Sequence, residues 1–306
     1  MDNKNSFFSL PGRSRPANFR SRFHQINRCR LTRLFVLLMI SLFTTSCFQD
    51  AEKREGNLII ATSLPVFGSI ISELTLPNDE IVVLLNNNQS PHEYQPRPSD
   101  VRRFSNAEIV FLGHPDLDGW AGRLSDVSPL FLAATNSDSH VNPHFWFDPM
   151  EVQKSAGIIT TSLCTSRPLL CPDYEELLDI FEIQLAVLDT KIVHVIDPLA
   201  GESVVTSHPF FDYFLTRYNI TSVATLESSP DHEASPSSVI EVLDQIKNHS
   251  PIGVIAQQHE SSGILQIIKD ETELPVVFIE AIGNSEQSYE AFMMSAAASI
   301  ISLRRN

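Results

Sequence analysis

The sequence lacks the features that would place it in several other classes of protein. It has no internal repeat, no low-complexity tract and no apolar run of the ~20 residues that a bilayer-spanning helix needs. It also contains neither a His-Glu-x-x-His motif nor a nucleophile elbow, the usual marks of a zinc protease or an α/β-hydrolase. Because 42% of the residues are hydrophobic, we still expect a packed core. We expect a folded protein that is not an enzyme.

Basic residues are scarce beyond position 46. The first 46 residues hold eight of the 22 Lys and Arg residues but only one of the 37 Asp and Glu residues. The rest of the chain therefore has 14 basic against 36 acidic residues, a net charge of −22 with His neutral. Such a surface repels nucleic acid, so we expect no nucleic-acid partner, and it is compatible with gathering cations.

The first 46 residues have the order of an export signal. A basic segment precedes the short apolar run Leu34–Phe43, and small residues follow it up to Ser46. Cys47 comes next and resembles the cysteine of a bacterial lipobox, although Thr44 stands where Leu is usual. We expect an exported chain, lipid-anchored through Cys47 on the periplasmic or extracellular face of the membrane. Cleavage that leaves Cys47 unmodified and an uncleaved interfacial segment are the alternatives.

Only two cysteines follow Cys47, at Cys164 and Cys171. In an oxidising compartment they could form a disulfide, and two free buried thiols are the alternative. The loop between them is short, so a disulfide would stabilise the fold by about 2.5 kcal/mol through chain entropy.

Strand-like and helix-like patterns alternate along the rest of the chain, with one long exception. Between Asp173 and Ile196 apolar residues recur at helical spacing with no Gly or Pro, which predicts a helix about 36 Å long. A βα half lies on each side of it. This order predicts an α/β fold of two (β/α) lobes with parallel-type sheets, joined by one long backbone helix. The boundaries we expect are 1–46 for the export signal, 47–56 for a tether, 57–172 for the N-terminal lobe, 173–197 for the linking helix and 198–306 for the C-terminal lobe.

The short apolar runs suit buried parallel strands. The strands expected are Leu58–Thr62, Ile81–Leu85, Glu108–Leu112, Ser203–Thr206, Ser222–Thr225, Gly253–Ala256 and Val276–Ile279. The remaining helices expected are Val66–Leu74, Asp100–Ser105, Pro149–Ser162, Phe210–Tyr218, 236–248, Gly263–Asp270 and Glu286–Leu303.

Three histidines and one glutamate have a setting that suits metal binding. His92, His208 and Glu280 each follow an expected strand, and His144 precedes an expected helix. In open α/β sheets, ligands bind beyond the carboxyl ends of the strands. Three imidazoles with a carboxylate or a water form a tetrahedral site of the kind that zinc accepts, and such sites favour Zn, Cu, Fe or Ni over Mg or Ca. Two ligands would come from each half, so the sequence predicts a metal site in the cleft between the lobes.

Four stretches resemble the solute-binding lipoproteins of zinc and manganese ABC importers. They are Pro91–Asp100, Asn142–Pro149, Ser207–Phe214 and Ser229–Pro236. The resemblance runs from about Leu58 to the end of the chain. It implies two (β/α) lobes joined by a rigid helix, a monomeric receptor that delivers metal to the transmembrane subunits of an ABC permease, and no catalysis.

The resemblance also implies the metal ligands. His92, His144 and His208 stand at the first three ligand positions, and the third is typically Glu in manganese-type members, so His208 indicates Zn²⁺ with Mn²⁺ as the alternative cargo. The fourth ligand is typically an Asp followed by Pro. Here Glu280 followed by Ala281 occupies that place, so either Glu280 or water completes the site.

Two other functions stay open from the sequence. A zinc hydrolase would need a general base near the metal, for which Glu93 and Glu280 are the candidates. A surface lipoprotein acting as an adhesin is the other alternative, because some members of the family were first described as adhesins.

Overall fold

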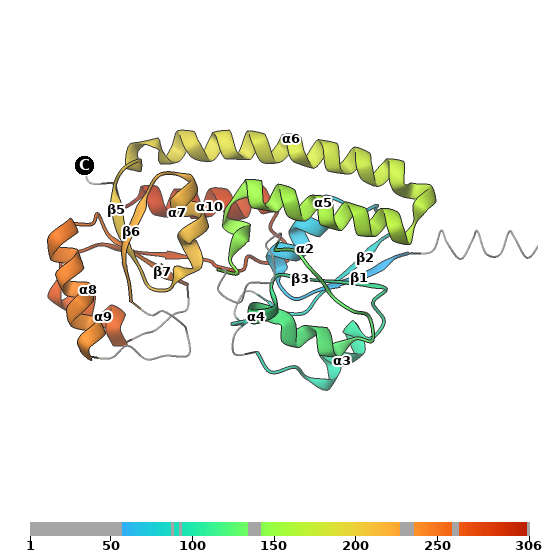
Figure 1. The fold of residues 1–306 in the computed structure, drawn as a ribbon, viewed down its shortest axis with the longest axis horizontal. Helices are drawn as coiled ribbons and strands as arrows, with labels where there is room; N and C mark the ends of the chain where they lie inside the picture. Colours follow the sequence, from blue (N-terminus) through green and yellow to red (C-terminus); the bar gives the residue numbers. More distant parts are fainter. Residues whose placement is uncertain are drawn as a thin grey trace, which may run out of the picture. The chain divides into compact units, whose positions relative to one another are not determined.

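The computed structural model describes residues 57–86, 89–91, 94–133, 142–226, 236–258 and 263–304. The expected export signal, the tether with Cys47, and His92 lie outside these ranges. Within them the chain forms a two-lobed α/β fold with two four-stranded sheets (Figure 1). The fold class predicted from the sequence is confirmed.

The first sheet has the strand order β2-β1-β3-β4, and all of its pairs are parallel. The strands are β1 (Ile59–Thr62), β2 (Glu80–Val83), β3 (Ile109–Leu112) and β4 (Leu130–Phe131). The starts of β1, β2 and β3 each differ by one residue from the sequence-based expectation, and two differences are larger. Strand β2 ends two residues before the expected Leu85, and β4 was not expected, because a strand of two residues is too short to show a hydrophobic period.

The second sheet repeats this arrangement with the order β6-β5-β7-β8, again parallel throughout. Its strands are β5 (Ser203–Thr206), β6 (Thr221–Thr225), β7 (Val254–Gln257) and β8 (Val276–Ile279). Strand β5 pairs with β6 on one side and β7 on the other, so successive connections leave it in opposite directions. Doubly wound folds bind their ligands at the carboxyl ends of the strands where the order reverses in this way.

Helices fill the connections between the strands. The α-helices are α2 (Pro65–Ser72), α3 (Pro98–Phe104), α4 (Pro115–Asp118), α5 (Pro149–Ser166), α6 (Cys171–Ile196), α7 (Asp212–Arg217), α8 (Pro236–His249), α9 (Gly263–Glu271) and α10 (Tyr289–Ile301). The 3₁₀ turns are η1 (Gly119–Leu124), η2 (Phe145–Phe147), η3 (Pro168–Leu170), η4 (Asp197–Leu199) and η5 (Pro209–Phe211). The helix expected at Phe210–Tyr218 is divided into η5 and α7, with Pro209 opening the 3₁₀ turn. The last helix is shorter at both ends than the expected Glu286–Leu303.

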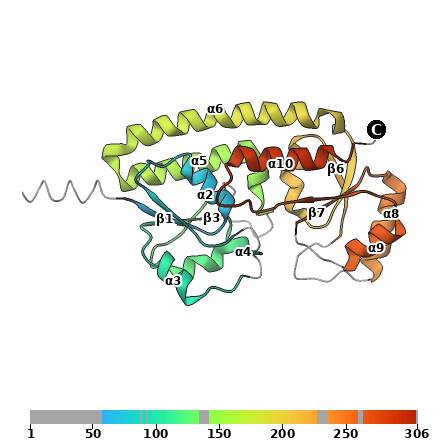
Figure 2. The same cartoon turned by 180° about the vertical axis from the view of Figure 1, so that it is seen from behind.

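The long helix α6 is continuous, as predicted, but begins at Cys171 instead of Asp173. Pro172 fits in its first turn, where no intrahelical N–H bond is required. One face of α6 is buried, and the helix runs alongside α5 and α10 (Figures 1 and 2). Within the described ranges, no helix combines the length and the apolar character needed to cross a membrane.

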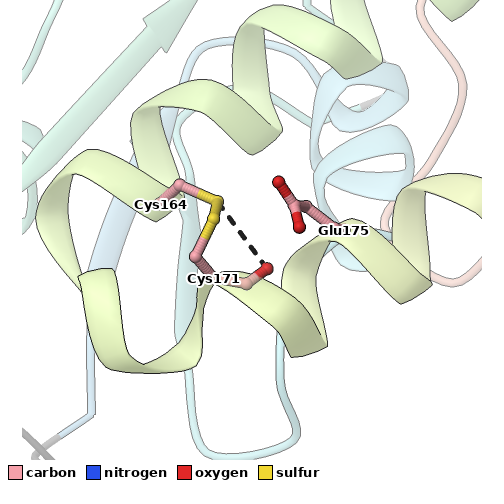
Figure 3. Close-up of side chains that lie close together, drawn as sticks. All are labelled: Cys164, Cys171 and Glu175. Atoms are coloured by element: carbon pink, nitrogen blue, oxygen red, sulfur yellow. Dashed lines mark hydrogen bonds between the residues drawn. A yellow bond between two sulfur atoms is a disulfide. The ribbon is translucent and has the colours of Figure 1, made fainter.

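A disulfide joins α5 to α6 at the turn that contains η3. Cys164 lies near the end of α5 and Cys171 begins α6, and their sulfur atoms are bonded (Figure 3). The link closes the turn between two helices that pack against each other, so it fixes the start of the long helix to the first lobe.

The end of the chain packs against the first lobe. After β8 the backbone carbonyl of Ile282 accepts a hydrogen bond from the N–H of Val66 over 2.9 Å. Gly283 follows with φ of +73°, a conformation that favours glycine. Helix α10 then contacts α2 as well as α6. One hydrophobic core therefore includes side chains from both sheets and from α6.

An ion-pair network adds a polar link between α5, α6 and α7. Arg217 in α7 donates to both carboxylate oxygens of Asp189 in α6, each over 2.7 Å. The same guanidinium lies 3.3 Å from the carboxylate of Asp148, which caps the start of α5. Such bidentate pairs have a defined geometry, so this network fixes the two lobes to the long helix.

Candidate metal-binding site

His144 and His208 lie together although 64 positions separate them in the sequence. Their ring centres are 5.2 Å apart and the rings are nearly perpendicular, at 84°. Both side chains are buried, with 5% and 7% of their surface exposed. The structure therefore brings one predicted ligand from each half of the chain into direct contact.

Strand β5 positions His208. The strand is buried and parallel to its neighbours, and it ends at Thr206. Two residues later His208 keeps an extended backbone, with φ −145° and ψ 153°, and precedes the turn η5 that begins at Pro209. His208 thus lies just beyond the carboxyl end of β5, the strand at which the strand order reverses.

A local turn positions His144 at the start of η2. The side-chain oxygen of Asn142 accepts the backbone N–H of His144 over 3.0 Å and lies 2.7 Å from its ring nitrogen Nδ1. Asn142 donates its own amide N–H to the carbonyl oxygen of Pro209 over 2.5 Å. Asn142 opens the Asn142–Pro149 motif, but no role for its side chain was predicted from the sequence. An Asn two residues before a His was the available signal, since Asn often bonds the backbone two positions on.

Aromatic residues pack against the turn that carries His144. The Trp146 ring lies 5.2 Å from the His144 ring and 5.3 Å from that of Phe67 in α2. The Trp146 indole N–H also donates to the carbonyl oxygen of Ala281 over 2.8 Å, and Tyr289 donates to the carbonyl of Trp146 over 2.8 Å. Trp146 is completely buried, so it holds the segment carrying His144 against the segment that follows β8.

Glu280 directly follows β8, as expected, and is partly buried. One of its carboxylate oxygens accepts the backbone N–H of Ile282 over 3.2 Å. Across the described ranges, His144, His208 and Glu280 do not form a group of three with all donor atoms within 4.8 Å of one another. The structure thus places Glu280 at the predicted end of its strand without bringing it into a closed three-ligand set.

His92 lies outside the described residues, but residues on both sides of it are held. Trp120 donates its indole N–H to the carbonyl oxygen of Pro91 over 3.0 Å. Tyr94 donates its hydroxyl to Asp100 over 2.7 Å, and its ring lies 5.3 Å from that of Trp120. Trp120 and Trp146 thus both anchor segments that adjoin predicted ligands.

Two carboxyl groups in the segments that carry predicted ligands have shifted pKa values. Burial raises the pKa of Asp100, but hydrogen bonds from the Arg97 backbone and the Tyr94 hydroxyl outweigh it, so the net pKa is lowered. Burial raises the pKa of Asp212 in α7, and a hydrogen bond from Asn142 only partly opposes that rise. Asn142 therefore contacts both the turn of His144 and the helix that follows His208.

Among the described residues, another group of three possible ligands has all of its donor atoms within 4.8 Å of one another. It consists of Cys164, Cys171 and Glu175, at the junction of α5 and α6 (Figure 3). Both sulfur atoms are bonded to each other in the disulfide, whereas a cysteine binds a metal ion as a thiolate. In this oxidised form the cluster cannot hold a metal.

Two parallel sheets, a connecting helix and a buried pair of histidines, one from each half of the chain, define a two-lobed solute-binding protein. The chain belongs to the ZnuA family, described as zinc-uptake complex component A, periplasmic, which matches residues 60–302. Proteins of this family are the substrate-binding components of metal ABC transporters, so the chain is a receptor for a metal ion and not an enzyme. Such receptors work with permease and ATPase components.

Individual relatives are distant but cover most of the chain. The manganese-binding lipoprotein MntA of Halalkalibacterium halodurans is 23% identical over 278 residues, which is 85% of this chain and 92% of the relative. The iron ABC transporter substrate-binding lipoprotein MtsA of Streptococcus pyogenes serotype M1 is 23% identical over 292 residues, 85% of this chain and 92% of the relative. A crystal structure of ZnuA is 19% identical with a TM-score of 0.72, covering 81% of this chain and all of that one.

Proposed function

We propose that this chain is an exported, lipid-anchored monomer that binds Zn²⁺ with His92, His144, His208 and Glu280 and passes it to an ABC permease. The proposed anchor is Cys47, and the lobes are taken as 57–172 and 198–306, with residues 173–197 as the linking helix. The observation that supports the site most directly is the contact between His144 and His208. Mn²⁺ is the alternative cargo, since one of the relatives is named for manganese.

The geometry of the two rings fits a tetrahedral ion. A Zn–N distance of about 2.0–2.1 Å puts the ion roughly 3.2 Å from each ring centre, and an angle of about 109° then separates the two centres by about 5.2 Å. The two ring centres are 5.2 Å apart. An octahedral angle of about 90°, which suits manganese better, would bring the centres nearer to each other. The ring separation is compatible with a tetrahedral ion such as zinc.

The donor set supports the same choice. Imidazole nitrogens suit Zn, Cu, Fe and Ni, whereas Mn²⁺ prefers more oxygen ligands. Three imidazoles with one carboxylate would leave the bound ion with a net charge of about +1, which a partly buried site tolerates better than +2. His208 at the third position is the residue on which the zinc assignment depends most.

Elemental analysis and native mass spectrometry on protein purified without added metal test this function. We expect one zinc per chain, and competition with a chelator should show that His144→Ala and His208→Ala each weaken zinc binding by at least about a hundredfold. His194→Ala, an exposed histidine on α6, is the matched control and should bind as wild type does. Zinc affinity that survives His208→Ala would show that the site is assigned to the wrong residues.

A further inference from the structure

The amide side chain of Asn142 contacts the two segments that carry the buried histidines. Its oxygen contacts the backbone N–H of His144 at 3.0 Å and the ring Nδ1 at 2.7 Å. Its nitrogen is 2.5 Å from the carbonyl oxygen of Pro209, the residue directly after His208. The Asn142 side chain also lowers the pKa of the Asp212 carboxyl, against the larger effect of burial. One short side chain therefore contacts both histidine-bearing segments.

The orientation of this amide is fixed by its neighbours. The backbone N–H of His144 can only donate, so the atom facing it must be the Asn142 oxygen. The carbonyl of Pro209 can only accept, so the atom facing it must be the amide nitrogen. A rotated amide would place donor against donor and acceptor against acceptor, which settles the assignment without seeing hydrogen atoms.

That orientation also fixes the proton on the His144 ring. An amide oxygen accepts only, so Nδ1 of His144 must carry the hydrogen that it donates to Asn142. In the neutral ring the lone pair is then on Nε2. A metal-binding histidine commonly has its other nitrogen held in this way, which sets both the tautomer and the ring direction.

We propose that Asn142 is a positioning residue that orients the His144 ring. Through it, the metal affinity of His144 depends on the position of residues 209–212 relative to Asn142. This inference rests on the proposed metal site. While the amide is held by the carbonyl of Pro209, its contact with Nδ1 keeps the His144 ring in one orientation, with the lone pair on Nε2. When the 209–212 segment moves away, the amide loses its anchor, the His144 ring loses its orientation, and the ion is held less tightly. A small movement of that segment would thus release the metal without a large rotation of the lobes.

Three substitutions test the proposal. Asn142→Ala removes both contacts and should weaken zinc binding about 10- to 100-fold at unchanged stoichiometry, mainly through faster dissociation. Asp212→Ala removes a partly buried carboxyl that interacts with the Asn142 side chain, so we expect a smaller loss in the same direction, about 3- to 10-fold. Asn284→Ala is the matched control, since that side chain also accepts a backbone N–H two residues on and donates its amide locally, to Gln287. It should leave affinity unchanged.

A spectroscopic measurement separates positioning from a general loss of structure. Long-range ¹H–¹⁵N spectra of the metal-free protein report which ring nitrogen of His144 carries the proton. We expect the Nδ1–H form alone in wild type and in Asn284→Ala, and a mixture of both forms in Asn142→Ala. If Asn142→Ala does not fold, the affinity of Asp212→Ala decides the question.

The two possible failures are distinguishable. Wild-type zinc affinity in Asn142→Ala, or a His144 ring that stays entirely in the Nδ1–H form without Asn142, would overturn the positioning role. If wild-type protein binds no transition metal at all, the proposed function fails, and the tautomer comparison in metal-free protein still shows whether Asn142 orients His144.

Discussion

Trp146 donates its indole N–H to the carbonyl oxygen of Ala281 across 135 positions of sequence. This bond joins the segment after His144 to the segment after Glu280. Together with the Val66–Ile282 backbone bond and the contacts of α10 with α2, it connects the two lobes at several points besides α6. Receptors that close by rotation about a hinge need residues that absorb large dihedral changes, and a continuous helix offers none.

We therefore expect metal binding to change the separation of the lobes very little. Small-angle scattering with and without zinc should give nearly the same radius of gyration, while a hinge-closing sugar receptor measured in parallel should contract. A clear contraction of the size seen in that receptor would rule out the rigid connection.

Removing the indole N–H alone tests how much this bond contributes. Trp146→Phe keeps a ring in the aromatic cluster but leaves the carbonyl of Ala281 without its donor. We expect a loss of about 1–3 kcal/mol in the free energy of unfolding, because a buried acceptor is left unsatisfied. Urea unfolding followed by circular dichroism measures it. Unchanged stability would mean that water replaces the donor at no cost.

Acid should weaken the network between α6 and α7. Burial raises the pKa of Asp189, but hydrogen bonds and charge from Arg217 and the Tyr218 hydroxyl outweigh it and lower the net pKa. A carboxyl with a lowered folded-state pKa stabilises the protein above its unfolded pKa of about 3.9, and that contribution is lost as the pH falls through the folded value.

The Asp189→Asn variant isolates this contribution. The difference in unfolding free energy between wild type and Asp189→Asn should be largest near pH 6 and should shrink as the pH is lowered below about 4. Asp179→Asn, an exposed position on the same helix, should show no such pH-dependent difference. A constant difference from pH 6 to pH 3 would contradict the assignment.

The disulfide should matter for stability and not for metal binding. Replacing both Cys164 and Cys171 by Ser should lower the free energy of unfolding by about 2.5 kcal/mol, the chain-entropy value for so short a loop. The bond lies at the α5–α6 turn and contacts neither histidine, so zinc affinity should stay at the wild-type value. A loss of zinc binding in a folded double variant would show that α6 transmits the constraint to the site.

Export should depend on Cys47. If this residue is lipidated, Cys47→Ser should release soluble protein into the extracytoplasmic fraction while zinc binding in that fraction is retained. One acyl chain gives only marginal anchoring, so the modified N-terminal peptide should carry more than one chain. Mass spectrometry of that peptide from membrane-extracted wild type measures this, and a peptide without lipid mass would exclude the anchor.

Local patterns in the sequence were enough to predict most of the secondary structure. The strand Val276–Ile279 and the end of the long helix at Ile196 were predicted to the residue, because hydrophobic period and Pro positions are encoded locally. Strand β4 was missed, since two residues carry no period. The first two residues of α6 were also missed, because a proline such as Pro172 can either precede a helix or stand in its first turn.

The sequence by itself determined the alternation of strands and helices, the single long helix and the motifs that carry His144 and His208. These depend on residue type and spacing along the chain. Only the tertiary structure decided that the two imidazoles meet at 5.2 Å and that Asn142 is held by Pro209, 67 positions away. Only it decided that Trp146 anchors the segment after Glu280 as well as packing in the core. Contacts of this kind arise when two sheets and one helix pack into a shared core, and no local pattern specifies which distant backbone carbonyl a side-chain donor will meet.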